Sequence, residues 1–163
     1  MAEVIVETTT GKVRGATVDG VHRFRGIPYG RPTGGPARFQ RSGPPEPWAG
    51  IRDALEYGPT APQLTQHVEE GSSAGSTEGL TGQFVNFIAG LAGDEPAIGE
   101  DCLVLNVWTG GLDQQMPRPV MVWVHGGAFT TGTGSWPLYD GTPLASRNDV
   151  VVVTINHRLG ALG

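Results

Sequence analysis

The sequence is poor in cysteine and lysine. Cys102 is the single cysteine of the 163 residues and Lys12 the single lysine, against ten arginines scattered along the chain. A lone cysteine excludes an intrachain disulfide and a cysteine-rich metal site. The 4 histidines lie far apart in the sequence and match no metal-ligand spacing, so no metal centre is predicted.

Long apolar runs and an excess of positive charge are also missing. No run approaches the ~18 apolar residues of a membrane span, and the opening residues MAEVIVETTTGKV have no basic-then-apolar signal pattern. A net charge of −5 leaves no basic footprint for nucleic acid. We therefore expect a cytoplasmic protein that binds neither nucleic acid nor a membrane.

Glycine and proline are abundant, with 26 and 13 residues. Several apolar runs interrupt them, which predicts a loop-rich globular chain of about one domain rather than a disordered one. Residues 1–28 predict an antiparallel meander of three short strands, because VIVET, KVRGATV and VHRFRGI alternate with turns. The second turn is Asp19-Gly20, a favoured two-residue hairpin turn. Eight prolines between 28 and 62 predict an extended wrap over residues 29–63.

The second half of the chain predicts the start of an α/β sheet. The runs at 102–108, 119–125 and 150–156 are apolar without alternation, as in strands of a covered sheet. Between the last two, residues 142–148 predict a short helix with Thr142 as its N-cap and Pro143 at its first position. Residues 64–99 are polar and variable in character, except for an amphipathic helical stripe formed by Phe84, Phe87, Ile88 and Leu91.

One stretch, VMVWVHGGAFTTGTGS (120–135), ends a predicted buried strand in two glycines. Glycines at the carboxyl edge of a sheet let the backbone adopt positive φ and approach a ligand closely. Such a loop turns N–H groups toward a developing negative oxygen, forming an oxyanion hole. An ordinary Gly-Gly turn is the alternative interpretation of the dipeptide alone.

Six stretches together resemble the type-B carboxylesterase/lipase family of the α/β-hydrolase fold, and they occur in the family's order. They are FRGIPYG (24–30), RFQRSGPPEPW (38–48), YGPTAPQ (57–63), EDCLVLNVW (100–108), VMVWVHGGAF (120–129) and VVVVTINHRLGALG (150–163). The resemblance implies that residues 1–163 are the N-terminal part of a single catalytic domain, incomplete as given. Antiparallel hairpins would lead into a central, mostly parallel sheet.

The resemblance also assigns roles in the 120–135 loop. Matched position by position, the N–H groups of Gly127 and Ala128 are two oxyanion donors, and Gly126 is the hinge that aims them. His125 shapes the loop without exchanging protons. In the family, the residue directly after the nucleophile supplies the third oxyanion donor.

The family's nucleophile is a serine in G-x-S-x-G on a strand-to-helix turn. The match GSSAG at 71–75 is rejected, because two acidic residues rather than a buried strand precede it and it lies upstream of the oxyanion loop. Ser135 lacks the final glycine. We therefore expect the catalytic serine, acid and histidine beyond residue 163.

The resemblance thus predicts a serine carboxylesterase that hydrolyses carboxylic esters without a cofactor. Its partners would be a small-molecule ester and the remaining C-terminal part of the enzyme. Residues 1–163 alone would be inactive and poorly soluble, because the apolar run at 150–156, an interior strand in the complete fold, would have an open edge. The alternative is an esterase-like binding or adhesion protein that has lost its serine. The intact HGGA disfavours that alternative, since an abandoned oxyanion hole need not keep its glycines.

Four further expectations come from this resemblance. In relatives, a disulfide to the cysteine of EDCL often closes the loop at 64–99. Here that cysteine is Cys102, and Ala61 occupies the position of the second cysteine. The loop is then an uncross-linked lid over the active site, or its apolar stripe simply packs on the core. Arg38 is expected to pair with Glu100, and the family usually has tyrosine where His157 stands.

Charge is distributed unevenly along the chain. No lysine or arginine lies between Arg52 and Arg118, while ten of the sixteen acidic residues do. If this segment rims the pocket, it disfavours anionic esters. The alternative is a solvated acidic face without effect on the substrate.

Overall fold

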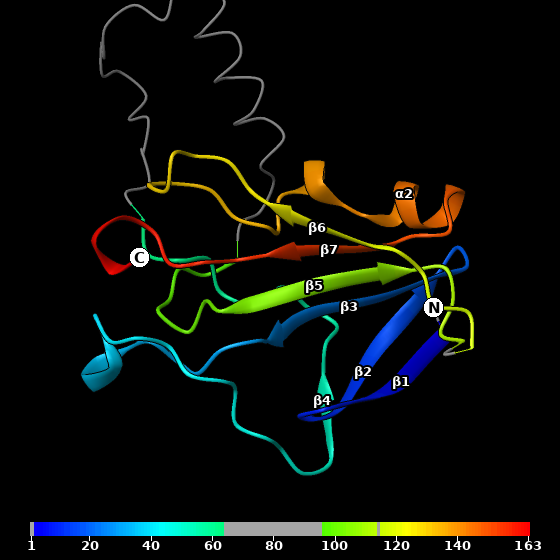
Figure 1. Cartoon of the computed structure of the whole chain (residues 1–163), viewed down its shortest axis with the longest axis horizontal. Coiled ribbons are helices and arrows are strands. Elements are labelled where there is room, and N and C mark those ends of the chain that lie inside the picture. The colour runs from blue at the N-terminus through cyan, green and yellow to red at the C-terminus, as the bar shows by residue number, and fades with distance from the viewer. Residues whose placement is uncertain (1, 64–95, 114) are drawn as a thin grey trace, which may run out of the picture.

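The computed structural model describes residues 2–63, 96–113 and 115–163, and these form one mixed sheet with little helix (Figure 1). The strand order is β1-β2-β3-β5-β7-β6, with β4 paired to β2 outside that order. The strands are β1 (Ala2–Thr8), β2 (Gly11–Val18), β3 (Val21–Pro28), β4 (Ile51–Asp53), β5 (Val104–Thr109), β6 (Val120–Val124) and β7 (Val151–Ile155). The helices are α2 (Thr142–Arg147) and the single turns η1 (Gly35–Ala37), η2 (Pro137–Tyr139) and η3 (Gly160–Leu162).

The predicted N-terminal meander is confirmed. Strands β1, β2 and β3 pair antiparallel in sequence order. Asp19 and Gly20 join β2 to β3 with φ values of 51° and 78°, so both central residues of the turn are left-handed, as the favoured two-residue hairpin requires.

The proline-rich segment is mostly extended, but the expectation of no regular element there is wrong at one place. Strand β4 pairs parallel with residues 12–14 of β2. Strand β3 pairs only with residues 16–18 of β2, so the rest of that edge is open to another strand. Trp48 holds the segment before β4 beside this edge, because its indole Nε1–H donates to the carbonyl of Lys12 at 2.9 Å.

The three apolar runs are the strands β5, β6 and β7, as predicted, but the expected burial is wrong for β6, which is exposed at every residue because no described strand or helix covers it. Their spatial order corrects a second expectation. The 150–156 run was expected to leave an open edge. Instead β7 lies between β5 and β6, pairing antiparallel with one and parallel with the other. Within the described residues the open edge belongs to β6, where each side chain from Val120 to Val124 is 37–60% exposed.

Helix α2 follows the prediction except at its cap. Thr142 is the first helical residue rather than the N-cap, and its N–H donates to Oδ1 of Asp140 at 2.7 Å. The carboxylate thereby pairs one of the N–H groups that lack a partner at the start of a helix. The helix packs over β3, β5 and β7 and closes a core of Val21, Trp108, Ala145 and Val152 (Figure 1).

Two further features considered in the sequence are a membrane span, which was not expected, and a lid. No helix among the described residues is long and apolar enough to cross a membrane. The stripe of Phe84, Phe87, Ile88 and Leu91, and Ser73 with it, lies outside the described residues.

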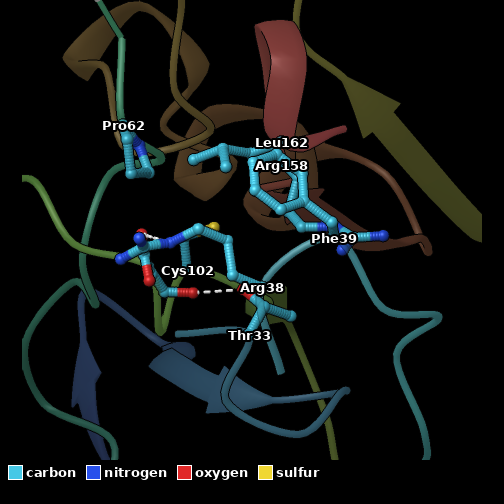
Figure 2. Close-up of a pocket in the computed structure, with 8 residues that line it drawn as sticks. Thr33, Arg38, Phe39, Pro62, Cys102, Arg158 and Leu162 are labelled. Carbon is cyan, nitrogen blue, oxygen red and sulfur yellow. Dashed lines mark hydrogen bonds and ion pairs between the residues drawn. The ribbon is translucent and has the colours of Figure 1, made fainter. Parts of the chain in front are cut away.

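The predicted pair of Arg38 and Glu100 is confirmed, with 2.6 Å between Nε and Oε1. Figure 2 shows Arg38 beside Thr33 and Cys102, and the Thr33 hydroxyl donates to the Glu100 carbonyl at 2.5 Å. The hydrogen bond and the charge of Glu100 raise the pKa of Arg38 above its ordinary value. The Arg38 side chain is 48% exposed, so solvent screens the pair, which positions the proline-rich wrap more than it stabilises the fold.

Trp108 generates the first prediction, because its indole leaves no room at Gly141. A Cβ at Gly141 would lie 2.9 Å from the Trp108 ring and 2.8 Å from Cγ1 of Val152. Gly141→Ala should therefore lower the free energy of unfolding by about 1–3 kcal/mol, the usual cost of overpacking. Urea unfolding of the full-length protein measures this.

Gly43→Ala is the matched control. A Cβ at Gly43 would meet only Arg31 at 3.5 Å, an ordinary contact, so its change should stay within about 0.5 kcal/mol. Equal effects of the two substitutions would contradict the packing argument.

Candidate active site

The loop that follows β6 lies at one edge of the sheet. Strands β6 and β7 are parallel and β5 runs against both β3 and β7, so the carboxyl ends of β3, β6 and β7 share this edge (Figure 1). Ligands of open α/β sheets bind at such carboxyl edges. The residues predicted to act, His125 to Ala128, therefore stand where chemistry is expected.

The loop backbone has positive φ at three consecutive residues, two of which carry a side chain. Gly127, Ala128 and Phe129 have φ values of 114°, 53° and 60°, and such angles are costly for residues with a side chain. At Gly127 a Cβ would overlap the carbonyl oxygen of Thr131, so only glycine fits. Gly126, predicted as the hinge, has no positive φ and its Cβ would meet nothing within 4 Å. The unusual conformation thus begins one residue later, at Gly127.

The strained backbone leaves two predicted donors without acceptors. The N–H groups of Thr130 and Thr131 both donate to the Gly127 carbonyl, at 3.0 and 3.1 Å. Among the residues that the structure describes, no acceptor takes the N–H of Gly127 or of Ala128. Both residues are exposed. Two adjacent, solvent-accessible N–H groups are what an oxyanion or another anion requires.

Asn156, immediately after β7, holds the far end of the loop. Its Oδ1 accepts from the Gly134 N–H at 2.6 Å and from the Thr133 hydroxyl at 3.1 Å. Its Nδ2 donates to the Pro59 carbonyl at 2.9 Å, and its own carbonyl accepts from the Tyr29 hydroxyl at 2.6 Å. At 2% exposure, this one side chain joins the loop, the sheet and the proline-rich segment.

Gln63 holds the middle of the loop. Its Oε1 accepts from the Gly132 N–H at 2.8 Å, and its Nε2 donates to the Gly132 carbonyl at 3.0 Å. A further anchor comes from the end of the chain, where the Gly160 N–H donates to the Phe129 carbonyl at 2.7 Å. Sequence reasoning named neither Asn156 nor Gln63 as functional. The one signal was a polar residue directly after a buried run, in the case of Asn156.

His125 lies under the loop rather than facing solvent. It is 6% exposed and its Nδ1 lies 2.8 Å from the Gly126 carbonyl, so Nδ1 carries a hydrogen and donates it to that oxygen. Its ring stacks on His157, with 4.4 Å between centroids and 19° between planes. A Cβ at Gly132 would lie 2.5 Å from Nδ1, so Gly132 makes room for the ring.

Cys102 is not a nucleophile candidate. It is fully buried in a cluster with Ala61, Leu103 and Leu159, and burial raises the pKa of its thiol, with a smaller contribution from the nearby Asp101. Ala61 and Cys102 therefore meet in the core, where the family resemblance placed a disulfide. The cavity beside them (Figure 2) measures about 10 Å³ and is too small for a substrate.

Comparisons with known proteins show the fold and the family of the chain. The solved structure of a para-nitrobenzyl (PNB) esterase superposes with a TM-score of 0.75 at 42% identity, covering 98% of this chain and 28% of that chain. A carboxylesterase of Geobacillus stearothermophilus gives a TM-score of 0.75 at 38% identity, over 98% and 27% of the two chains. The described part of the chain therefore has the sheet of an α/β-hydrolase.

Residues 2–163 match the model of the Carboxylesterase family, and the chain belongs to that family. It is 42% identical to para-nitrobenzyl esterase of Bacillus subtilis (strain 168), over 100% of this chain and 29% of that protein. It is 43% identical to phenmedipham hydrolase of Pseudarthrobacter oxydans, over 98% and 29%. The chain thus spans a little under a third of the length of these relatives.

The anchoring role of Asn156 generates the second prediction. Asn156→Ala leaves the Gly134 N–H and the Pro59 carbonyl unpaired, and each buried polar group left so costs about 1–3 kcal/mol. We expect the free energy of unfolding to fall by at least that amount, and the amides of residues 132–135 to exchange faster with deuterium. Denaturant unfolding and hydrogen exchange of the full-length protein measure the two effects.

Asn148→Ala provides the comparison, because Asn148 is exposed and bonds only the Leu144 carbonyl, at 3.2 Å. It should change stability by less than about 0.5 kcal/mol. If loop exchange in Asn156→Ala matched that of the parent protein, Asn156 would not be the anchor.

Proposed function

We propose that this chain supplies the oxyanion hole of an enzyme that hydrolyses carboxylic esters. The observation that carries the proposal is the pair of unpaired N–H groups at Gly127 and Ala128, held in a strained loop at the carboxyl edge of the sheet. Membership of the Carboxylesterase family supports the same reaction class. The names of the relatives, a para-nitrobenzyl esterase and a phenmedipham hydrolase among them, support small-molecule substrates with a hydrolysable carbonyl.

The proposed reaction uses a serine, an acid and a histidine from outside residues 1–163. The serine hydroxyl attacks the ester carbonyl carbon while the histidine takes its proton. The carbonyl oxygen becomes an anion, which accepts hydrogen bonds from the Gly127 and Ala128 N–H groups. Collapse of this intermediate expels the alcohol, to which the histidine returns the proton. Water, activated by the same histidine, then releases the acid from the acyl-enzyme.

The role of His125 in this proposal is to support the loop. Its Nδ1–H is engaged with the Gly126 carbonyl and its ring is covered, so it is poorly placed to exchange protons with a substrate. Exchange of protons is left to the histidine of the triad. No cofactor takes part in any step.

The third prediction separates Gly127 from Gly126. Gly127→Ala forces a Cβ onto the Thr131 carbonyl and displaces the donors, so kcat should fall by about 10²–10³, the cost of losing an oxyanion donor, with KM nearly unchanged. Steady-state kinetics of the full-length enzyme on an activated ester such as a p-nitrophenyl ester measures this.

Gly126→Ala is the neighbouring comparison, since its Cβ enters open space. Its loss in kcat should be at least about tenfold smaller, because the donors keep their geometry. If Gly126→Ala proved the more damaging of the two, the hinge would be at Gly126 after all and the loop geometry argued above would be wrong.

The fourth prediction concerns residues 1–163 expressed alone. The exposed apolar edge of β6 should pair with other chains, and two oxyanion donors without a nucleophile catalyse no covalent step. We expect poor solubility and no turnover, with activity recovered when the rest of the enzyme is bound or fused.

Purification of the 163-residue chain and an assay with an activated ester test this. A soluble monomer whose turnover disappears in Ser73→Ala would contradict both the prediction and the rejection of 71–75 as the nucleophile motif. Turnover that survives Ser73→Ala would indicate a contaminating esterase or another nucleophile.

A further inference from the structure

The stacked imidazoles of His125 and His157 join the sheet to the loop. His157 follows Asn156 at the end of β7, and His125 follows β6, so the stack crosses between the two parallel strands at the edge where the donors lie. Phe129, the third of the consecutive residues with positive φ, meets the His157 ring edge-on with 6.2 Å between centroids. His157 therefore contacts the loop on both sides of Gly127 and Ala128.

The environment of His157 favours a neutral ring. Nδ1 of His157 is buried and has no hydrogen-bond partner among the described residues, so a proton there would be neither solvated nor paired. The centroids of the His125 and His157 rings are 4.4 Å apart, so positive charges on both rings would repel each other. Burial first, and His125 second, lower the pKa of His157 below its ordinary value of 6.5.

No other described charge compensates a proton on His157. The adjacent Arg158 directs its guanidinium to the Gln40 carbonyl, at 2.9 Å. The Tyr29 hydroxyl, the other titratable group near this end of β7, donates to the Asn156 carbonyl. Of the described residues, His125 is thus the titratable group that faces His157.

We propose that His157 is a positioning residue for the oxyanion loop, which it holds through the stacked ring of His125 only while the His157 imidazole is neutral. Acid then separates the rings and releases Gly127 and Ala128 from their catalytic arrangement. The inference rests on the proposed function for its effect on catalysis, whereas the coupling between His157 and the loop does not.

The direction of the pH effect follows from the lowered pKa. Above pH 6.5 His157 is neutral whether the protein is folded or unfolded, so the stack contributes fully. As the pH falls below 6.5, an unstacked His157 binds a proton while the stacked ring still stays neutral, which favours the unstacked state. The stabilisation by the stack therefore decreases between pH 6.5 and the lowered pKa of the stacked ring. The loop is therefore weakened on the acid side of neutrality and not on the alkaline side.

His157→Tyr is the central variant for the test, because it keeps an aromatic ring that titrates only near pH ~10. The full-length enzyme is followed by NMR between about pH 5 and pH 8, the range over which histidine changes charge. In the parent protein the His157 ring should titrate below 6.5, and the amide signals of Gly127 and Ala128 should move with the same midpoint. In His157→Tyr that midpoint should vanish from both amides.

Kinetics on an activated ester give the second readout. The catalytic histidine of the triad contributes its own acid limb to both proteins, so the difference between the two pH profiles isolates His157. We expect kcat of the parent at about pH 5, relative to its alkaline plateau, to fall about threefold to tenfold further than in His157→Tyr, a fraction of the effect of a lost donor. The KM profiles of the two proteins should coincide.

His22→Asn is the matched control, since His22 bonds the Thr17 hydroxyl on the N-terminal hairpin at 2.8 Å, remote from the loop. It should keep the pH profile of the parent. Amides of Gly127 and Ala128 that ignore the His157 titration, or identical acid limbs in the parent and His157→Tyr, would overturn the inference. If no ester is hydrolysed at any pH, the proposed function fails, and the NMR titration still decides whether His157 positions the loop.

Discussion

The candidate site depends on the hydrogen bonds of the Asn156 carboxamide. Its oxygen holds the Gly134 N–H and its nitrogen holds the Pro59 carbonyl, so one rigid group at the end of β7 fixes two loops that are distant in sequence. Thr154 adds to this on the same strand, donating to the Gly134 carbonyl at 2.8 Å and accepting from Asn106 at 2.9 Å. Both N–H and C=O of Gly134 are thereby paired inside the protein. A loop that leaves a sheet edge normally relies on water for this, and here the sheet itself replaces water.

That anchoring explains how the strained segment persists. Residues held at unusual φ cost about 1–3 kcal/mol each and are kept only where the surroundings over-determine them. Gln63 fixes Gly132 on one side of the strain, and the buried His125 fixes Gly126 on the other. Each such hydrogen bond contributes about 1 kcal/mol net, so several are needed to hold Ala128 and Phe129, the two residues with a side chain at positive φ. The proline-rich segment, which builds almost no regular structure, is thus the scaffold that keeps Gln63 and Pro59 in reach.

The sequence predicted where strands lie along the chain better than it predicted which strands pair in space. Apolar runs predicted β5, β6 and β7 because an unbroken apolar run is a local property of the sequence, although β6 itself is exposed. Asp19-Gly20 predicted its hairpin from backbone sterics. The place of β7 between β5 and β6, and the pairing of β4 with β2, depend on contacts across the chain that no local pattern contains. At the site, HGGA marked the loop, but it did not say that positive φ begins at Gly127 rather than at Gly126. Gln63 stayed unnoticed because a single polar residue in a proline-rich stretch has no periodicity.

The supports of the loop come from this chain alone. Asn156 and His157 hold it from the end of β7, Gln63 holds it from the proline-rich wrap, and Gly160 holds it from the chain's last turn. None of these contacts involves a ligand, so the Gly127 and Ala128 N–H groups are already arranged in the unliganded chain. Donors arranged in advance stabilise a developing charge without paying for reorganisation during the reaction, which is where most electrostatic catalysis originates. The strain at Ala128 and Phe129 is therefore set against the folding energy of the sheet and the wrap, and not against the binding energy of the substrate.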